Sequence, residues 1–304
     1  MECIMSWTSR MIRYYFNKSD CARDAGLTTP DDVVRYDDIA YGKNKKWQVL
    51  DVYRPKSKDC ALEALPVIIS VHGGGWVYGS KEVYQFYCMS LAQRGFAVVN
   101  FTYRLAPEFK FPAAVEDTDA VFHWVRSHAK EYGFDVDNIF GVGDSAGGHL
   151  LCLYSAMCTN PDYEKKLGFL PDDDRKPPRA VALNCGVYQI DLGPSGRKND
   201  KRLMRDVLKH HGNKDEIECI NPLPYITENF PATFIMTANH DSTVDAVQAQ
   251  MLLARLRELR CDYTFRVYGT EEKPLDHVFH CNVRLEAAAD CNTDECAFFH
   301  NHLE

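Results

Sequence analysis

The 304-residue sequence predicts an α/β fold in which helices cover both faces of a mostly parallel sheet. Short apolar runs rich in Val, Ile and Phe recur at wide intervals, as expected for strands buried on both faces. Segments with a helical spacing of apolar residues separate these runs, and strands that alternate with helices form parallel sheets. A hydrophobic content of 45% is ample for a single domain over residues 1–304, although length alone allows a second.

The sheet is expected to contain six buried strands and an antiparallel edge pair. The buried strands are expected at residues 66–72, 96–103, 138–143, 180–186, 232–238 and 264–269. Two earlier segments, 32–41 and 47–55, alternate apolar and polar residues more and fit the edge pair. Helices are expected between the strands at residues 81–95, 112–133 and 245–260. Gly95 and Gly133 mark the ends of the first two helices, and Pro112 suits the first turn of the second.

Two stretches fit no strand–helix unit. The first 30 residues offer a helix, and residues 187–230 contain a basic helix and a proline-rich return. We expect both to form a cap over the carboxyl edge of the sheet. The alternative is an ordinary terminal helix and an unrelated surface insertion.

The formal net charge of −8 bears on the partners and the location of the protein. Nucleic acids and anionic membranes carry the same sign of charge, so neither is expected as a partner. No window approaches the roughly 18 to 20 apolar residues that span a bilayer, and the first residues lack the pattern of a signal peptide. The sequence favours a cytoplasmic protein and leaves open whether it forms a homo-oligomer.

The twelve cysteines fit the reduced thiols of a cytosolic protein better than six disulfides, because no secretion signal is seen and the chain is long. Several lie in apolar runs, where a thiol packs as a small hydrophobic group. Cys291 and Cys296 have a spacing that zinc sites use, but no second pair lies near them in the sequence. No metal site is therefore predicted.

A serine stands between a buried strand and a helix in the segment Gly143-Asp144-Ser145-Ala146-Gly147. In open parallel sheets ligands bind beyond the carboxyl ends of the strands, so Ser145 is expected to project into that crevice. The spacing is that of a nucleophile elbow, whose tight turn leaves no room for side chains at Gly143 and Gly147. The following helix directs its positive end at the site and favours a developing anion. A corner of small residues that serves only packing is the alternative.

Three glycines, Gly73, Gly74 and Gly75, follow His72 directly after another buried strand. Without side chains, their backbone N–H groups can face a ligand. A serine nucleophile needs such donors for the oxyanion that forms on attack. We expect them from Gly74, Gly75 and Ala146, with Gly73 as a further contributor; a flexible glycine turn is the alternative.

These motifs resemble the hormone-sensitive-lipase-like family of α/β-hydrolases, which includes bacterial carboxylesterases with a His-Gly-Gly-Gly loop. The likeness runs from about residue 52 to residue 279 and includes HGGGWVYGS, YRLAPEFKFPAAVED and GDSAGG in this order. It implies an α/β-hydrolase fold with a mostly parallel, eight-stranded sheet, a helical cap from about residues 1–30 and 187–230, and ester hydrolysis without a cofactor. The segment 103–117 is then scaffolding beneath the oxyanion glycines rather than part of the catalytic machinery.

The resemblance also implies a catalytic triad in the order Ser, Asp, His, with the acid after a late strand and the base beyond the last strand. Asp241 and His277 hold these places, and His277 begins the H-x-F pattern of the family. The family's acid motif D-P-L-x-D is here DSTVD, which lacks Pro-Leu, so Asp245 stays as the alternative acid, although a carboxylate there also suits a helix start. His280 is the alternative base, and a metal held by these histidines and Cys281 is not expected, since a triad needs none.

The expected activity is hydrolysis of short-chain acyl or aryl esters, small-molecule substrates, through an acyl-enzyme intermediate on Ser145. Trp76 and Tyr78 follow the glycine loop and are expected to line the substrate pocket, with core packing as the alternative. Deacetylation of carbohydrate esters and hydrolysis of aryl formamides use the same triad and stay open. A non-catalytic member that only binds a small molecule is also open, but the presence of all three triad residues disfavours it.

Overall fold

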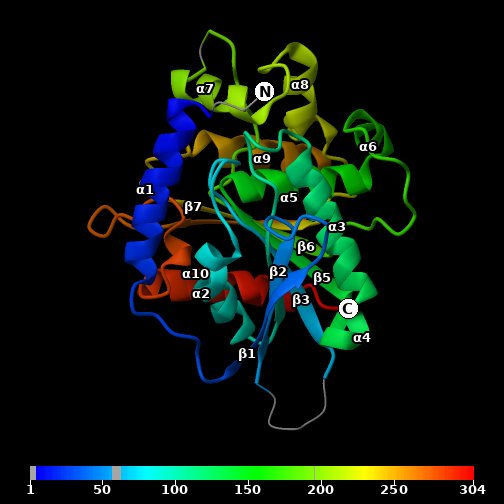
Figure 1. Cartoon of the computed structure of the whole chain (residues 1–304), viewed down its shortest axis with the longest axis vertical. Coiled ribbons are helices and arrows are strands. Elements are labelled where there is room, and N and C mark those ends of the chain that lie inside the picture. Colours follow the sequence, from blue (N-terminus) through cyan, green and yellow to red (C-terminus); the bar gives the residue numbers. More distant parts are fainter. Residues whose placement is uncertain (1–4, 57–62, 195) are drawn as a thin grey trace.

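A computed structural model describes residues 5–56, 63–194 and 196–304 of the chain. Within them, eight strands form one sheet in the order β1-β2-β4-β3-β5-β6-β7-β8 (Figure 1). Their bounds are β1 Val33–Ala40, β2 Val49–Pro55, β3 Leu65–Val71, β4 Ala97–Thr102, β5 Phe134–Asp144, β6 Ala180–Asn184, β7 Ala232–Ala238 and β8 Tyr263–Tyr268. Each strand predicted from the sequence is confirmed, with shifts of a few residues at its ends.

One edge of the sheet is antiparallel and the rest is parallel. β2 pairs antiparallel with both β1 and β4, which confirms the predicted edge pair, and every pairing from β4 to β8 is parallel. The register places Val71 beside Gly143, and Asp144 beside Asn184. The glycine loop after β3 and the serine after β5 therefore emerge next to each other at the carboxyl edge, where ligands bind in such sheets.

Helices cover both faces of the sheet, as predicted. The helices are α1 Trp7–Asp24, α2 Lys81–Ala92, α3 Ala113–Ser127, α4 Ala129–Tyr132, α5 Ala146–Thr159, α6 Pro161–Lys166, α7 Lys198–Val207, α8 Lys214–Ile220, α9 Val247–Leu259 and α10 Glu286–His300, with 3-10 turns η1 Leu223–Tyr225 and η2 Phe279–Cys281. Side chains along a strand point alternately to the two faces of the sheet, so neighbouring residues pack into the hydrophobic layers on opposite faces. Ile68 and Val98 pack with α2 and α10, whereas Ile69 and Val99 pack with α3, α5 and α9.

The predicted helices differ from the observed ones at two places. The helix expected over residues 112–133 is divided, because α3 ends before His128 and the short α4 then runs to Gly133, which has a φ of 62°. The C-terminal helix α10 has no counterpart among the predictions, and it buries Cys291 and Cys296 in the core. The cysteines that the structure describes all carry free thiols, as expected for a reduced protein.

The N-terminal helix α1 and the helix α7 of the 187–230 segment lie side by side (Figure 1). The backbone N–H of Ser6 and the hydroxyl of Ser9 both donate to the Asp206 carboxylate of α7, at 2.9 and 2.5 Å. Residues 1–4 of the predicted N-terminal segment lie outside the described residues. Among the helices of the described chain, none has the length and apolar character needed to cross a membrane.

Candidate active site

Ser145 lies at the corner between β5 and α5, where its backbone has a φ of 51° and a ψ of −119°. A non-glycine residue held in such a conformation costs about 1–3 kcal/mol, which the surrounding structure must offset. A Cβ at Gly143 would lie 2.6 Å from the carbonyl oxygen of Gly147, and one at Gly147 would lie 1.9 Å from that of Val71. The turn thus requires glycine on both sides of the serine, as the sequence pattern predicts.

The loop after β3 holds two backbone N–H groups without partners. Gly74 and Gly75 have φ values of 109° and 60°, and a Cβ at Gly74 would lie 2.2 Å from the carbonyl oxygen of Tyr78. Within the described chain, the N–H groups of Gly74, Gly75 and Ala146 form no hydrogen bond. Because Gly75, Ser145 and Ala146 line the same cavity, this cavity presents a hydroxyl together with unpaired donors.

Gly73 is placed differently from its two neighbours. Its N–H donates to the hydroxyl of Tyr84 at 2.9 Å, and that hydroxyl donates to Asp144 at 2.7 Å. We therefore leave Gly73 out of the candidate oxyanion donors. Tyr84, which the sequence analysis does not identify, fastens the glycine loop to the residue before Ser145. Burial raises the pKa of Asp144 to about 6, although the Tyr84 hydrogen bond and the charge of His277 oppose this rise.

Asp241 and His277 form a close pair at the ends of β7 and β8. The ring atom Nδ1 of His277 lies 2.8 Å from Oδ2 of Asp241, and an ionised carboxylate can only accept this hydrogen bond. The other oxygen of Asp241 accepts the N–H groups of Thr243 and Val244 at 2.9 and 2.8 Å. Burial on its own raises the pKa of Asp241. The hydrogen bond and charge of His277, together with the two amides, have a larger opposite effect, so the pKa lies below its usual value.

The two alternative residues have other surroundings. Asp245 accepts the N–H of Val247 at 2.9 Å at the start of α9, which is the helix-start role expected for it. His280 is fully buried with Nδ1 unpaired among the described residues, and burial lowers its pKa to about 3. His280 is thus neutral and shut off from solvent, whereas His277 retains 10% of its side-chain exposure.

The loop that carries His277 is held by a carboxylate that the sequence analysis does not single out. Asp276 accepts the N–H of His277 at 2.7 Å, and it accepts both the N–H and the hydroxyl of Ser242 at 2.8 and 2.9 Å. These bonds join the loop after β8 to the loop after β7. No hydrogen bond links Ser145 to His277 in the part of the chain that the structure describes, so the hydroxyl and the ring are not yet engaged.

The cavity beside Ser145 has a volume of about 720 Å³ and walls from α1, α7, α9 and the loops after β3, β5, β6 and β7. Its apolar lining consists of Ile12, Phe16, Trp76, Val187, Ile190, Leu203, Met204, Val244 and Val247. Its polar lining includes Gln189, Asp191, Arg197, Asn199, Asp200, Asp245 and Gln248. The cavity therefore offers both apolar contacts and groups that form hydrogen bonds to a small molecule.

The two predicted pocket aromatics occupy different places. Trp76 lines the cavity, and its indole N–H donates to Nδ1 of His149 at 3.1 Å, which fixes the ring. Tyr78 does not line this cavity. Its ring packs against Phe16, and its hydroxyl donates to Asp20 of α1 at 2.8 Å. Tyr78 therefore anchors the N-terminal helix, and we leave it out of the candidate pocket.

Two groups of side chains bring metal-binding atoms within 4.8 Å of one another, Cys185-Asp241-His277 and Asp144-His280-Cys281. A metal binds the thiolate form of cysteine. Burial raises the pKa of Cys185 and of Cys281, so the thiolate is disfavoured in both groups. The first group already has an internal hydrogen bond between its acid and its histidine, which accounts for its closeness without a metal.

Comparison with known sequences identifies relatives of the chain. A family model described as BD-FAE matches residues 50–256. The esterase LipC of Mycobacterium tuberculosis is 29% identical over 224 residues, which cover 72% of this chain and 54% of LipC. An arylesterase of Saccharolobus solfataricus is 32% identical over 210 residues, which cover 67% of this chain and 66% of that protein. The chain spans 52% to 59% of the length of LipC and of its relatives LipQ and LipM.

Solved structures match the fold over almost its whole length. Esterase B from Lactobacillus rhamnosis superposes with a TM-score of 0.85 at 24% identity, covering 98% of this chain and 97% of that one. EstE1, a carboxylesterase cloned from a metagenomic library, superposes with a TM-score of 0.76 at 22% identity, covering 97% and 98%. At these identities the likeness establishes the fold, and it confirms the predicted α/β-hydrolase architecture.

Proposed function

The chain belongs to the BD-FAE family, and from this premise we propose that it is a serine carboxylesterase acting on short-chain acyl or aryl esters. Ser145 is the proposed nucleophile, His277 the base and Asp241 the acid that orients it. The names of the relatives, esterases and an arylesterase, support this reaction class. The observation that carries the proposal is one cavity that presents a strained serine and unpaired N–H groups, next to a hydrogen-bonded acid–histidine pair.

In the first half of the proposed reaction, the hydroxyl of Ser145 attacks the ester carbonyl while Nε2 of His277 accepts its proton. The N–H groups of Gly74, Gly75 and Ala146 then bind the oxyanion. Each such donor contributes roughly 3 kcal/mol to the stability of the transition state. The positive end of α5, which begins at Ala146, adds to this stabilisation.

In the second half, His277 returns the proton to the leaving alcohol, which departs and leaves an acyl group on Ser145. A water molecule gives its proton to the same imidazole and attacks the acyl group, which releases the acid. Asp241 holds the ring in the tautomer that carries hydrogen on Nδ1 and stabilises the imidazolium form. Its lowered pKa keeps it ionised for this role at neutral pH.

We propose that the missing hydrogen bond between Ser145 and His277 forms when substrate binds. Catalytic hydrogen bonds are often long before substrate arrives and tighten in the reactive complex.

A second candidate is the removal of acetyl groups from carbohydrate esters by the same residues. It is favoured by the polar side chains among the lining of the cavity, such as Asn199, Asp200 and Asp245. Such groups can bind the hydroxyls of a sugar. An aryl formamide fits the apolar part of the cavity and stays as a further substrate to test.

We also propose that the chain is a single hydrolase domain, with α1 and the 187–230 segment as its cap. The contact of Gly75 with both supports this, because a Cβ built there would lie 3.8 Å from Ile12 and 3.6 Å from Leu203. A cytoplasmic location is proposed from the free thiols of the described cysteines.

The proposal is tested with a panel of aryl esters of increasing acyl length, acetylated sugars and an aryl formamide. A fluorophosphonate probe, which labels only an activated serine, is applied to the wild type and to the Ser145→Ala variant. We expect labelling of the wild type alone and the fastest turnover on short acyl chains. Labelling of neither protein would exclude an activated serine and leave a role in binding.

A further inference from the structure

The outer face of α1 exposes aromatic side chains to solvent. Trp7, Tyr14 and Tyr15 are 70%, 62% and 56% exposed, and Met11 lies among them in the sequence of the helix. We call these four residues the aromatic strip. Large aromatic side chains are seldom left so open on a helix unless they meet a partner.

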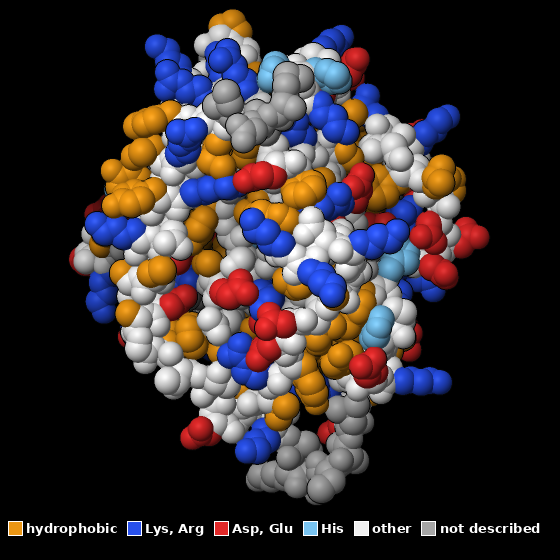
Figure 2. All heavy atoms as spheres, viewed as in Figure 1, with side chains coloured by type: hydrophobic (Ala, Val, Ile, Leu, Met, Phe, Trp, Pro, Cys, Tyr) orange, Lys and Arg blue, Asp and Glu red, His pale blue; other side chains and the backbone are white. Residues whose placement is uncertain are grey.

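The neighbouring helix α7 carries a strong positive charge, in contrast to the net charge of −8 of the whole chain. Residues 197–214 contain seven Lys and Arg residues and only two Asp residues. Arg202, Arg205 and Lys209 are exposed, and their side chains form no ion pair within the described residues. Figure 2 shows Lys and Arg side chains gathered over α7, with hydrophobic side chains on the neighbouring outer edge over α1. We call Arg202, Arg205 and Lys209 the basic patch.

The two features belong to one rigid surface. Ser6 and Ser9 of the α1 region both donate hydrogen bonds to Asp206 of α7. Because this carboxylate is buried, it adds no negative charge to the exposed surface around the basic patch. The other acid of the segment, Asp200, pairs with Arg197 at 2.9 Å. The exposed charge of α7 is thus almost entirely positive.

A shallow groove lies between the aromatic strip and the cavity beside Ser145, and it shares lining residues with that cavity. The groove has a volume of about 210 Å³, and Trp7, Met11 and Tyr15 form its outer wall. Its inner wall consists of Thr8, Ile12, Phe16 and Asn199, which also line the cavity beside Ser145. The residues that the groove and the cavity share are two apolar side chains, Ile12 and Phe16, and two polar ones, Thr8 and Asn199, so an apolar chain in the groove would lie next to the cavity.

We propose that the aromatic strip and the basic patch together bind an anionic lipid surface, and that ester substrates pass from this surface along the groove to Ser145. Aromatic rings with a polar edge favour the boundary between lipid and water, and Lys and Arg bind anionic headgroups. The expectation from the net charge of −8 that an anionic membrane is no partner concerns the chain as a whole, and the basic patch is a local exception to it. The acidic remainder of the protein is repelled by the same surface, so only this side faces the lipid. The lipid-binding step stands alone, and the delivery of substrate rests on the function proposed above.

A nucleic acid would meet the same basic patch, but it does not account for the groove that leads from the exposed aromatics to the ester cavity. A lipid surface explains the strip, the patch and the groove together.

Binding is measured by sedimentation of the Ser145→Ala variant of the full chain with vesicles, so that hydrolysis plays no part. We expect binding to vesicles of phosphatidylcholine mixed with phosphatidylglycerol, and little binding to phosphatidylcholine alone. Each basic residue near an anionic surface contributes about fivefold to the affinity. The added pair Arg202→Gln and Arg205→Gln should thus weaken binding by roughly 25-fold, and added Trp7→Ser should weaken it separately.

A matched control removes two exposed basic residues elsewhere, Lys130→Gln on α4 and Arg266→Gln on β8. This control should bind as the parent does. Any of three results overturns the proposal. The protein binds both kinds of vesicle equally, it binds neither, or the control loses as much affinity as the Arg202→Gln and Arg205→Gln pair. Polyuridylate is tested as a competing partner. If the Arg202→Gln and Arg205→Gln pair weakens its binding as much as it weakens vesicle binding, and Trp7→Ser does not weaken it, the surface is a polyanion site instead.

The delivery step has its own measurement in the otherwise wild-type enzyme. The Arg202→Gln and Arg205→Gln pair should leave kcat/KM for a water-soluble ester unchanged, because neither residue lines the cavity. It should lower the rate on the same ester class embedded in anionic vesicles. Loss on both substrates would contradict delivery. If the wild type hydrolyses no ester at all while vesicle binding persists, the proposed function fails and the lipid-binding surface stands.

Discussion

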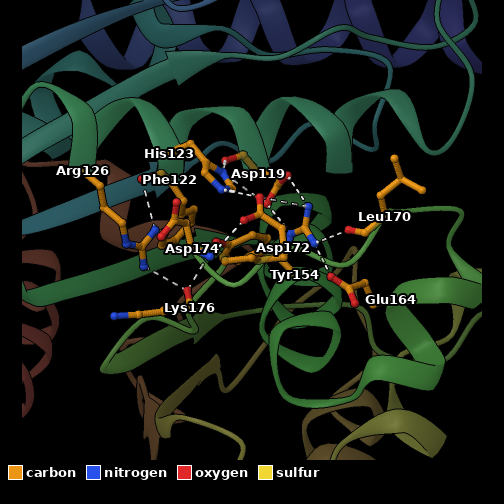
Figure 3. Close-up of polar contacts among 11 residues, drawn as sticks. Asp119, Phe122, His123, Arg126, Tyr154, Glu164, Leu170, Asp172, Asp174 and Lys176 are labelled. Carbon is orange, nitrogen blue, oxygen red and sulfur yellow. Dashed lines mark hydrogen bonds and ion pairs between the residues drawn. The ribbon is translucent and has the colours of Figure 1, made fainter.

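Two regions of the molecule differ in the partners of their buried ionisable side chains, which are opposite charges in one region and neutral hydrogen-bond donors in the other. At the junction of α3, α6 and the loop before β6, the side chain of Arg175 is only 6% exposed. Its acidic partners Asp119, Glu164 and Asp172 come together there (Figure 3). Arg175 contacts Asp119 at 2.8 Å and also pairs with Glu164 and with the carbonyl oxygen of Leu170. Burial lowers the pKa of Arg175, but the bonds to Asp119 and Glu164 raise it overall, so the guanidinium stays charged.

Beneath Ser145 the buried carboxyl groups have only neutral donors as hydrogen-bond partners. Asp144 accepts the hydroxyl of Tyr84 at 2.7 Å, and Glu295 accepts Tyr87 and Asn184 at 2.8 and 2.6 Å. Within the described residues neither carboxyl group forms an ion pair. Burial raises the pKa of Asp144 to about 6 and that of Glu295 to about 7.

We interpret this difference as one between a structural region and the proposed active site. In the Arg175 region the buried guanidinium is paired with the carboxylates of Asp119 and Glu164. The region around Ser145 keeps N–H groups unpaired and a backbone strained, which weakens the fold but leaves these groups available to a substrate. Substitutions in the two regions should therefore affect different measured quantities.

The largest expected effect is the loss of activity in Ser145→Ala. Removing the hydroxyl should lower kcat for a short-chain aryl ester by about 10⁶-fold. The melting temperature should stay close to that of the wild type, because the side chain forms no hydrogen bond in the described structure. Turnover that persists in purified Ser145→Ala would refute the assignment of the nucleophile.

Asp241→Asn is expected to have the next largest effect. The amide cannot replace the carboxylate that holds His277 in the required tautomer, so kcat should fall by about 10⁴-fold. Asp245→Asn is the comparison variant, and we expect a much smaller loss of kcat there, because Asp245 lines the cavity and accepts the N–H of Val247 but does not hold His277. A greater loss of kcat in Asp245→Asn than in Asp241→Asn would exchange the roles of the two acids.

Arg175→Met tests the structural region. It leaves Asp119 and Glu164 buried without a cation, and breaking such a pair costs about 3–5 kcal/mol of unfolding free energy. We expect this loss in urea unfolding, with kcat of the folded fraction unchanged. Adding Asp119→Asn and Glu164→Gln should restore part of the stability. A large fall in kcat without loss of stability would show that the two regions are coupled.

Glu295→Gln is expected to have a smaller, pH-dependent effect on stability. The pKa of this carboxyl is raised from 4.5 to about 7, so its stabilising contribution is complete below pH 4.5 and is lost as the pH rises toward 7. The shift corresponds to at most about 3 kcal/mol. Glutamine keeps a neutral partner for Tyr87 or Asn184, so the variant should gain stability relative to the wild type at pH 8 but not at pH 4. An equal difference at both pH values would contradict the raised pKa.

The sequence predicts the sheet well because each strand is a short apolar run with clear ends. The helix α10 is harder to predict, because Asn292 and Glu295 occupy buried positions that a search for apolar spacing treats as exposed. Asp241 and His277 are predicted from chain order together with the family resemblance, with Asp245 and His280 as the alternatives. The hydrogen bond between Asp241 and His277, and the bond between Asp276 and Ser242 that joins their loops, depend on residues far apart in the chain.

The loop after β3 shows the limits of motif reasoning in more detail. The glycines at 74 and 75 are predicted as donors and are unpaired, but Gly73 donates to Tyr84. Trp76 lines the cavity and Tyr78 does not, although both follow the same motif. The path of the backbone through positive φ values at Gly74, Gly75 and Trp76 sets these directions, and no spacing in the sequence encodes it.

The central claim is that Ser145, His277 and the unpaired N–H groups converge on one reacting centre. The most direct measurement is a crystal structure of the wild type after reaction with a short-chain alkyl phosphonate, which mimics the tetrahedral intermediate. We expect phosphorus bonded to Oγ of Ser145, Nε2 of His277 at about 3 Å from that oxygen, and the phosphonyl oxygen at about 3 Å from the N–H groups of Gly74, Gly75 and Ala146. A phosphonyl oxygen directed to solvent, with the imidazole out of reach of Ser145, would contradict the account.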